Sequence, residues 1–307
     1  MRRSFAVLLI FAGLFCGAGR LFAQPVPPST VMPPVRYVTV YGQRMAYYDL
    51  SNGPVLVLIH GFGTSAAIDW AQVIRPLSQH YRVIAIDNIG FGLSDKPNIA
   101  YTTQTFVDFL AEFLRELNIT HFNLAGESMG GLIAAFYAAE SAAPGASIPI
   151  VDKLVLSDAA IFDPKGPVTW PPVDHKPTGF VPSSIEEYRQ GLANGLFVNP
   201  AFATEAYARD VYQMLLTYHS APTAAALFSG AGGTKSQDYL RDHLKDIRIP
   251  TLIIWGQNDK LIPLSSGDYI HQTIAGSKLI VVSECGHAPG MEKPAVYLEN
   301  VLPFLGQ

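Results

Sequence analysis

The chain has 307 residues, of which 49% are apolar, and a formal net charge of −4 from 21 basic and 25 acidic side chains. This balance leaves no excess of positive charge to bind nucleic acid or an anionic membrane surface, so neither is expected as a partner. An apolar fraction this high in a chain of this length predicts one large folded domain with a substantial core.

The first 23 residues have the three parts of a secretory signal peptide. Two arginines precede an apolar run over residues 5–15, and small residues follow it. The run is shorter than the roughly 20 apolar residues that a membrane-spanning helix needs. Cleavage after Ala18 or Ala23 is expected, which predicts an exported protein, periplasmic or secreted, with no integral membrane association after cleavage. An uncleaved anchor and a lipoprotein are the weaker alternatives, the latter because a bulky residue precedes Cys16.

Removal of this leader takes away three arginines and one cysteine, leaving 18 basic against 25 acidic residues and a formal charge of −7. Cys285 is then the only cysteine, so no intramolecular disulfide is expected, and this thiol is assigned to packing. Residues 24–35 contain five prolines and are interpreted as an extended tether.

The folded part is predicted to begin with a hairpin over residues 36–50 that turns at Gly42. Continuous apolar runs follow, as expected for strands buried on both faces of a parallel sheet. They lie at residues 54–60, 81–87, 122–127, 152–158, 250–256 and 278–284. Helices are predicted between them, notably at residues 102–117 and 129–143. This alternation predicts an α/β fold with a mostly parallel, doubly wound sheet.

One interval breaks the alternation, because no strand-like run appears between residues 161 and 245. It begins rich in proline and continues with amphipathic pieces at 183–197 and 203–219, which predict helices. We interpret it as a helical lid. The predicted organisation is a signal peptide (1–23), a tether (24–35), an α/β core (36–160 and 246–307) and the lid (161–245).

A serine lies where one predicted strand passes into a helix. The stretch G-E-S-M-G over residues 126–130 fits the pattern G-x-S-x-G, in which a sharp strand-to-helix turn exposes the serine hydroxyl. Glycines permit the tight turn, and the Met129 N–H at the helix start can face a developing anion. A capping serine in a glycine-rich turn is the ordinary alternative. The position between strand and helix favours Ser128 as a nucleophile.

A serine nucleophile needs a base that a third group holds in place. His287 follows the last predicted strand and Asp259 follows the one before it. Functional groups of an open α/β sheet gather at such strand ends. We therefore predict that His287 is the base and Asp259 the acid that orients it. Asp158, which ends the strand before the lid, is the alternative acid.

The stretch H-G-F-G over residues 60–63 follows the first long strand. Its glycines let the backbone approach a substrate oxygen, and the Phe62 N–H is predicted to pair with that of Met129 in an oxyanion hole. His60 is interpreted as a residue that holds this loop rather than as a second base.

Taken together, these motifs resemble the α/β-hydrolase superfamily over roughly residues 36–305. They are HGFG (60–63), DNIGFGLSD (87–95), GESMGG (126–131), WGQNDKLIP (255–263) and GHAPGMEKP (286–294). The site residues that the resemblance implies are Ser128, Asp259 and His287 for catalysis, with Phe62 and Met129 for the oxyanion hole. It also implies a structural role for the second motif.

A serine at this turn suits acyl transfer, whereas similar epoxide hydrolases and haloalkane dehalogenases use an aspartate there. The predicted lid is rich in aromatic residues and poor in lysine and arginine, which favours a neutral ester with a small or medium acyl group. The predicted activity is therefore that of an exported serine hydrolase that cleaves carboxylic esters through an acyl-enzyme intermediate. The alternatives are a C–C bond hydrolase, a perhydrolase-like enzyme, and a non-catalytic binding protein of the same fold. No metal or cofactor is implied, and the sequence leaves the oligomeric state open.

Overall fold

A computed structural model of the chain describes residues 25–164, 182–199, 202–220, 222–223, 227 and 232–306. The predicted signal peptide lies outside these residues, so the leader, its cleavage and export stay predictions. None of the helices in the described part is long and apolar enough to cross a membrane.

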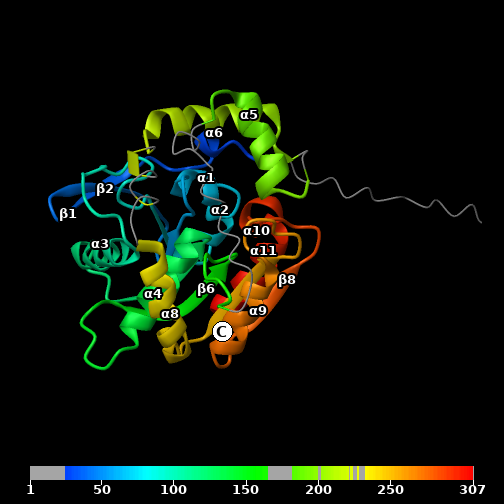
Figure 1. Ribbon diagram of the computed structural model, residues 1–307. Helices are drawn as coiled ribbons and strands as arrows, with labels where there is room; N and C mark the ends of the chain where they lie inside the picture. Colours follow the sequence, from blue (N-terminus) through cyan, green and yellow to red (C-terminus); the bar gives the residue numbers. More distant parts are fainter. Residues whose placement is uncertain are drawn as a thin grey trace, which may run out of the picture.

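One eight-stranded sheet forms the centre of the molecule (Figure 1). Its order is β1-β2-β4-β3-β5-β6-β7-β8, and the strands pair in parallel except where β2 meets β1 and β4. The strands are β1 (Arg36–Val40), β2 (Gln43–Leu50), β3 (Val55–Ile59), β4 (Arg82–Ile86), β5 (His121–Glu127), β6 (Ile150–Ser157), β7 (Thr251–Gly256) and β8 (Lys278–Val282). The hairpin predicted at the start of the fold is β1 and β2. Its turn residues Tyr41 and Gly42 have φ of 50° and 77°, the left-handed backbone that tight hairpin turns require.

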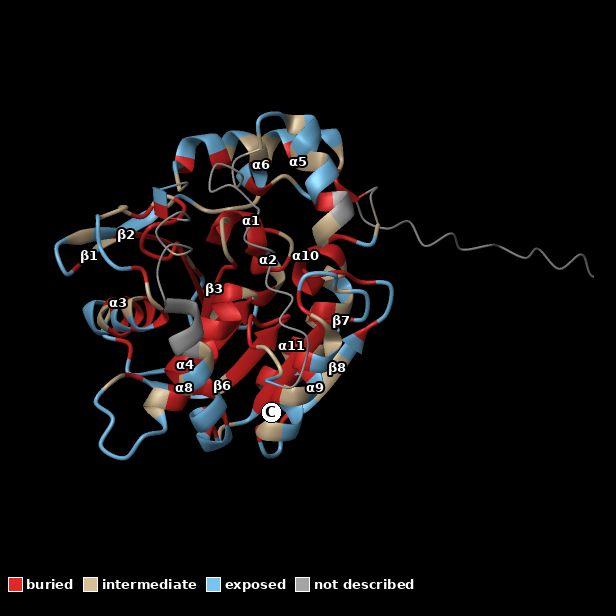
Figure 2. Cartoon of the chain, in the orientation of Figure 1, coloured by how far each residue is buried: buried red, intermediate tan, exposed pale blue. Residues whose placement is uncertain are grey.

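Successive side chains of the central strands enter two different cores, as the pleat of a strand dictates. In β3, Val57 and Ile59 face one core, while Leu56 and Leu58 face the other. The first core is covered by α3 (Thr103–Glu116), α4 (Met129–Ser141), α8 (Gly232–His243) and α9 (Leu264–Thr273), and the second by α1 (Ala66–Trp70), α2 (Ile74–Leu77) and α11 (Pro294–Gly306). Figure 2 shows the buried sheet between these layers. The predicted doubly wound, mostly parallel sheet is confirmed.

The expectation of burial on both faces is wrong for the last apolar run. β8 pairs only with β7 at the edge of the sheet, and Val281 is 41% exposed. An edge strand is covered less completely than a central one, although its run of apolar residues looks the same in the sequence.

The order of the strands determines where a ligand site can form. From β3 the chain moves to β4 on one side of it, and β5 then lies on the other side. The connections that follow β3 and β5 therefore leave in opposite directions, and open α/β sheets bind ligands at the carboxyl ends of the strands where this occurs. The H-G-F-G loop and the predicted serine follow these two strands.

The described part of residues 161–245 is mostly helical and contains α5 (Ile185–Gly191), the π-helical turn η3 (Leu192–Leu196) and α6 (Glu205–Tyr218). Figure 1 shows α5 and α6 together above the rest of the molecule, with α1 and α10 (Pro289–Glu292) beneath them. The last helix of the interval, α8, packs instead on α4, where the rings of Phe136 and Tyr239 stack at 4.2 Å. A lid function for α5 and α6 stays a prediction.

Residues 25–35, expected to form an extended tether, are bonded to the body of the protein. Val26 exchanges two hydrogen bonds with the Gln72 side chain, at 3.0 and 2.7 Å. Further along, the Ser29 N–H donates to Asp210 of α6 at 2.9 Å. The segment therefore joins the α1–α2 region to α6.

Candidate active site

The turn at Ser128 has an unusual backbone. Its φ of 53° and ψ of −115° lie in a region that residues with a side chain rarely adopt. The surrounding glycines make this turn fit, because a Cβ on Gly126 would collide with the Gly130 carbonyl, and one on Gly130 with that of Ile59. β3, β5 and α4 thus approach one another closely, and Ser128 lies partly exposed at their junction.

The three predicted catalytic side chains form one hydrogen-bonded series. Ser128 Oγ lies 2.8 Å from His287 Nε2, and His287 Nδ1 lies 2.7 Å from Asp259 Oδ2. The second Asp259 oxygen accepts the N–H groups of Leu261 and Ile262 at 2.8 and 3.0 Å. The Asp259 side chain is fully buried and that of His287 is 6% exposed. With a proton on Nδ1, His287 donates to the carboxylate and presents Nε2 to the serine hydroxyl as an acceptor.

The alternative acid, Asp158, lies beside this series without taking the place of Asp259. It follows β6 with φ of 40°, is fully buried, and accepts the Gly256 N–H at 2.9 Å. Burial, reinforced by the negative charge of Asp259, raises the pKa of Asp158 well above its usual range. No hydrogen bond joins Asp158 to His287 among the described residues, whereas Asp259 Oδ2 lies 2.7 Å from His287 Nδ1. The geometry therefore favours Asp259 as the acid.

Asp158, Asp259 and His287 each place one donor atom within 4.8 Å of the others, which is close enough to share a cation. The His287–Asp259 hydrogen bond already joins two of these groups. We assign no metal to them, and the expectation that no metal or cofactor is needed stays a prediction.

The H-G-F-G loop lies directly beside the serine. A Cβ built on Gly61 would be 3.3 Å from Ser128 Cβ, and the Gly61 N–H donates to Asp69 at 2.7 Å. Phe62 follows Gly61, and Met129 opens α4, so the two predicted oxyanion residues belong to segments that meet at Ser128. Their role as oxyanion donors stays a prediction.

His60 joins this loop to the next one. Its Nδ1 donates to the Gly61 carbonyl at 2.7 Å, and its Nε2 accepts the Asn88 N–H at 3.0 Å. Burial lowers the pKa of His60 to about 4, so the ring is neutral at physiological pH. These contacts agree with a role in holding the loop and leave no ring nitrogen available as a base.

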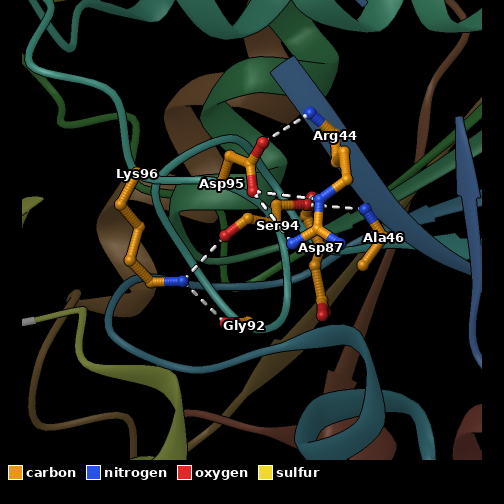
Figure 3. Close-up of polar contacts among 7 residues, drawn as sticks. All are labelled: Arg44, Ala46, Asp87, Gly92, Ser94, Asp95 and Lys96. Carbon is orange, nitrogen blue, oxygen red and sulfur yellow. Dashed lines mark hydrogen bonds and ion pairs between the residues drawn. The ribbon is translucent and has the colours of Figure 1, made fainter. Parts of the chain in front are cut away.

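The loop over residues 87–95 is organised around a buried carboxyl. Asp87 accepts the Ala66 N–H at 2.8 Å, and burial raises the pKa of Asp87 to about 6. The Ser94 hydroxyl donates to the Asp87 carbonyl at 2.6 Å and accepts the Ala46 N–H at 2.8 Å (Figure 3). Gly92 has φ of 51°, and a Cβ there would collide with the Asp87 carboxyl. These bonds join β2, β4 and α1 near the site, which is a structural role.

Sequence reasoning missed two acidic residues that support the site. Asp69, on α1, holds the H-G-F-G loop through Gly61, and burial raises the pKa of Asp69 to about 6. Glu292, on α10, accepts backbone N–H groups from two separate segments. Asp69 belongs to none of the motifs, whereas Glu292 lies within GHAPGMEKP (286–294), where no role was assigned to it. The available signal was an acidic residue within an apolar stretch, as in A-A-I-D-W for Asp69.

Aromatic residues of the inserted segment pack at least partly against the core. Phe197, Tyr207 and Tyr218 are buried in a cluster with Ile68 of α1 and Met291 of α10. Three other aromatic residues of the predicted lid lie outside the described residues: Trp170, Phe180 and Phe228. Packing accounts for the first three, and the lining of a substrate pocket stays a prediction.

Comparison with known proteins identifies the family of the fold. Residues 54–294 match the family model described as alpha/beta hydrolase fold. The chain is 28% identical to a pimeloyl-[acyl-carrier protein] methyl ester esterase of Aeromonas hydrophila, over 83% of this chain and 96% of that protein. It is 26% identical to a 2-hydroxy-6-oxo-6-(2'-aminophenyl)hexa-2,4-dienoic acid hydrolase of Metapseudomonas resinovorans, over 89% and 91%. A solved membrane phospholipase A superposes with a TM-score of 0.73 at 27% identity, covering 91% of this chain and 87% of that one.

Proposed function

Because the chain belongs to the alpha/beta hydrolase fold family and is a hydrolase, we propose that it cleaves carboxylic esters with Ser128 as the nucleophile. The observation that carries the proposal is the hydrogen-bonded series from Ser128 through His287 to Asp259, with distances of 2.8 and 2.7 Å. A hydroxyl in this arrangement has an acceptor for its proton, and the acceptor has a carboxylate that orients it.

The reaction follows from these positions. As Ser128 Oγ bonds to the ester carbonyl carbon, its proton passes to His287 Nε2, and Asp259 stabilises the resulting imidazolium. The negative charge on the former carbonyl oxygen is stabilised by the N–H groups of Phe62 and Met129. His287 then protonates the departing alkoxide as its bond to carbon breaks, which leaves an acyl-enzyme. Water then bonds to the acyl carbon as the same imidazole takes its proton, and His287 returns that proton to Ser128 Oγ as the bond between Oγ and the acyl carbon breaks and the acid leaves.

The charge around the site favours a neutral substrate. Asp69 is a buried carboxyl whose pKa of about 6 leaves it mostly charged at neutral pH, and its charge acts on His287. A further negative charge on the substrate would be repelled in a site of low dielectric constant. We therefore propose a neutral ester with a small or medium acyl group.

A second candidate reaction is hydrolysis of a C–C bond on the same catalytic series. It is favoured by the similarity to the dienoic acid hydrolase of Metapseudomonas resinovorans. The buried Asp69 carboxyl and the predicted export count against it, because such a substrate is anionic and arises from intracellular catabolism.

A panel of p-nitrophenyl esters tests the proposal. We expect the highest kcat/KM for short or medium acyl chains, and a lower value for a hemisuccinate ester than for a neutral ester of similar length. A lactone and a vinylogous diketone should be measured beside them. Inactivity on every ester with turnover of the diketone would assign the chain to C–C hydrolysis. Failure of a fluorophosphonate to label the protein would instead indicate a non-catalytic binding protein.

We also propose that the protein is exported and acts in the periplasm or outside the cell, which the sequence of the first 23 residues supports. N-terminal sequencing of protein recovered from the periplasm or medium of a bacterial host should find Gly19 or Gln24 first. Recovery of the intact chain beginning at Met1 in the membrane fraction would favour an uncleaved anchor.

A further inference from the structure

The loop that carries His287 makes direct backbone contact with the segment inserted between β6 and β7. The His287 N–H donates to the Leu196 carbonyl at 2.7 Å. A Cβ on Gly286 would collide with the same carbonyl, so the two backbones approach at a distance that only glycine permits. Residues 192–199, which begin with the π-helical turn η3, therefore pack directly against the His287 loop.

Glu292 joins the same two segments through its side chain. One carboxylate oxygen accepts the Gly286 N–H at 2.7 Å, next to His287. The other accepts the N–H groups of Val198 and Asn199 at 2.9 and 2.8 Å. Glu292 is 7% exposed, so these bonds are largely shielded from water. Hydrogen bonds to a charged, buried group are among the stronger ones in proteins.

We propose that Glu292 is a positioning residue, whose carboxylate fastens residues 192–199 to the His287 loop so that the imidazole faces Ser128 only while that segment is docked. The inference rests on the proposed role of His287 as the base. It assigns the inserted segment a share in assembling the catalytic series, in addition to any role in covering substrate. Any motion of the predicted lid then has to leave residues 192–199 docked on the His287 loop.

Replacement of Glu292 by glutamine tests these hydrogen bonds specifically. The amide of Glu292→Gln has one oxygen that accepts and one nitrogen that does not, so either Gly286 or the pair from the inserted segment loses its acceptor. The side chain keeps its length, and the change therefore separates the bonds from the space that the residue fills.

A matched control lies in the same inserted segment. At the start of α5, Glu187 accepts the N–H and the hydroxyl of Ser183 with one carboxylate oxygen, at 2.7 and 2.5 Å. The amide oxygen of Glu187→Gln can keep both bonds, so this variant removes a negative charge from the inserted segment at an exposed position without removing an acceptor, and it should leave kcat unchanged.

The test measures kcat and KM on the preferred ester with the full chain, after titrating active sites with a fluorophosphonate. For Glu292→Gln, kcat per titrated site should fall about 10- to 100-fold, the range that misplacement of a catalytic group by about 1 Å produces. KM should change little, because Glu292 is not proposed to touch substrate. A purely structural role would lower the number of titrated sites and leave kcat per site unchanged, which would overturn the proposal.

Hydrogen exchange tests the coupling without reference to activity. In Glu292→Gln, protection of backbone N–H groups should fall both in residues 196–199 and in residues 285–288, whereas Glu187→Gln should affect neither. Loss confined to one of the two segments would contradict the proposal. If the glutamine variant does not fold, Glu292→Asp replaces it in the test. This variant keeps the charge, but its side chain is too short to reach both segments. An unchanged kcat per titrated site in Glu292→Asp would contradict the proposal. Absence of fluorophosphonate labelling in the wild type would instead count against the proposed function, and the exchange result would still decide the coupling.

Discussion

Replacement of Ser128 by alanine is expected to lower kcat/KM for ester hydrolysis by a factor on the order of 10⁴ or more. The variant lacks the oxygen that bonds to the substrate, and the imidazole 2.8 Å away has no proton to accept. Binding and any oxyanion stabilisation remain, and they account for the residual rate. Alanine fits the same partly exposed turn, so the fold should persist.

A control for Ser128→Ala should replace a serine that lies at the same helix but away from the site. Ser141, at the opposite end of α4, donates to the Ala138 carbonyl, and Ser141→Ala should keep wild-type kinetics. Thermal unfolding and circular dichroism should be measured on both variants to check that they are folded. Retention of most activity in folded Ser128→Ala would remove this residue from the mechanism.

Replacement of His287 by alanine is expected to be about as damaging, because the serine then loses the only base in hydrogen-bonding distance among the described residues. Asp259→Asn should cost somewhat less. The asparagine can still occupy the space beside Nδ1, but it no longer stabilises an imidazolium, and it can orient the wrong tautomer. The measurement is kcat/KM on one ester for each variant at a fixed pH.

Asp158→Asn is the matched control for the acid. Asp158 has no part in the proposed mechanism, its raised pKa already favours the neutral form, and the amide oxygen can keep the bond from the Gly256 N–H. The variant should therefore stay far closer to the wild type than Asp259→Asn does. A crippled Asp158→Asn beside a mild Asp259→Asn would transfer the role of acid to the residue after β6.

Much of the fold was predictable because its signals are local. The apolar runs marked the strands from β3 to β8, and Gly42 marked the hairpin turn, since each depends on the conformational preferences of a few consecutive residues. The turn at Ser128 belongs to the same class. Gly126 and Gly130 leave room for the close approach of β3, β5 and α4, and the sequence displays them directly.

The sequence by itself therefore determined the class of fold and indicated a candidate nucleophile and its candidate partners at the strand ends. Only the tertiary structure gives a reason to favour Asp259 over Asp158, because both follow strands that end at the same edge of the sheet and, among the described residues, only Asp259 is hydrogen-bonded to His287. It alone showed Glu292 bonded to Val198, 94 residues away, and β8 at the edge of the sheet. One physical reason explains why these three features could not be predicted from the sequence. A local pattern fixes the backbone of its own segment, whereas the partner of a buried side chain depends on how distant segments dock.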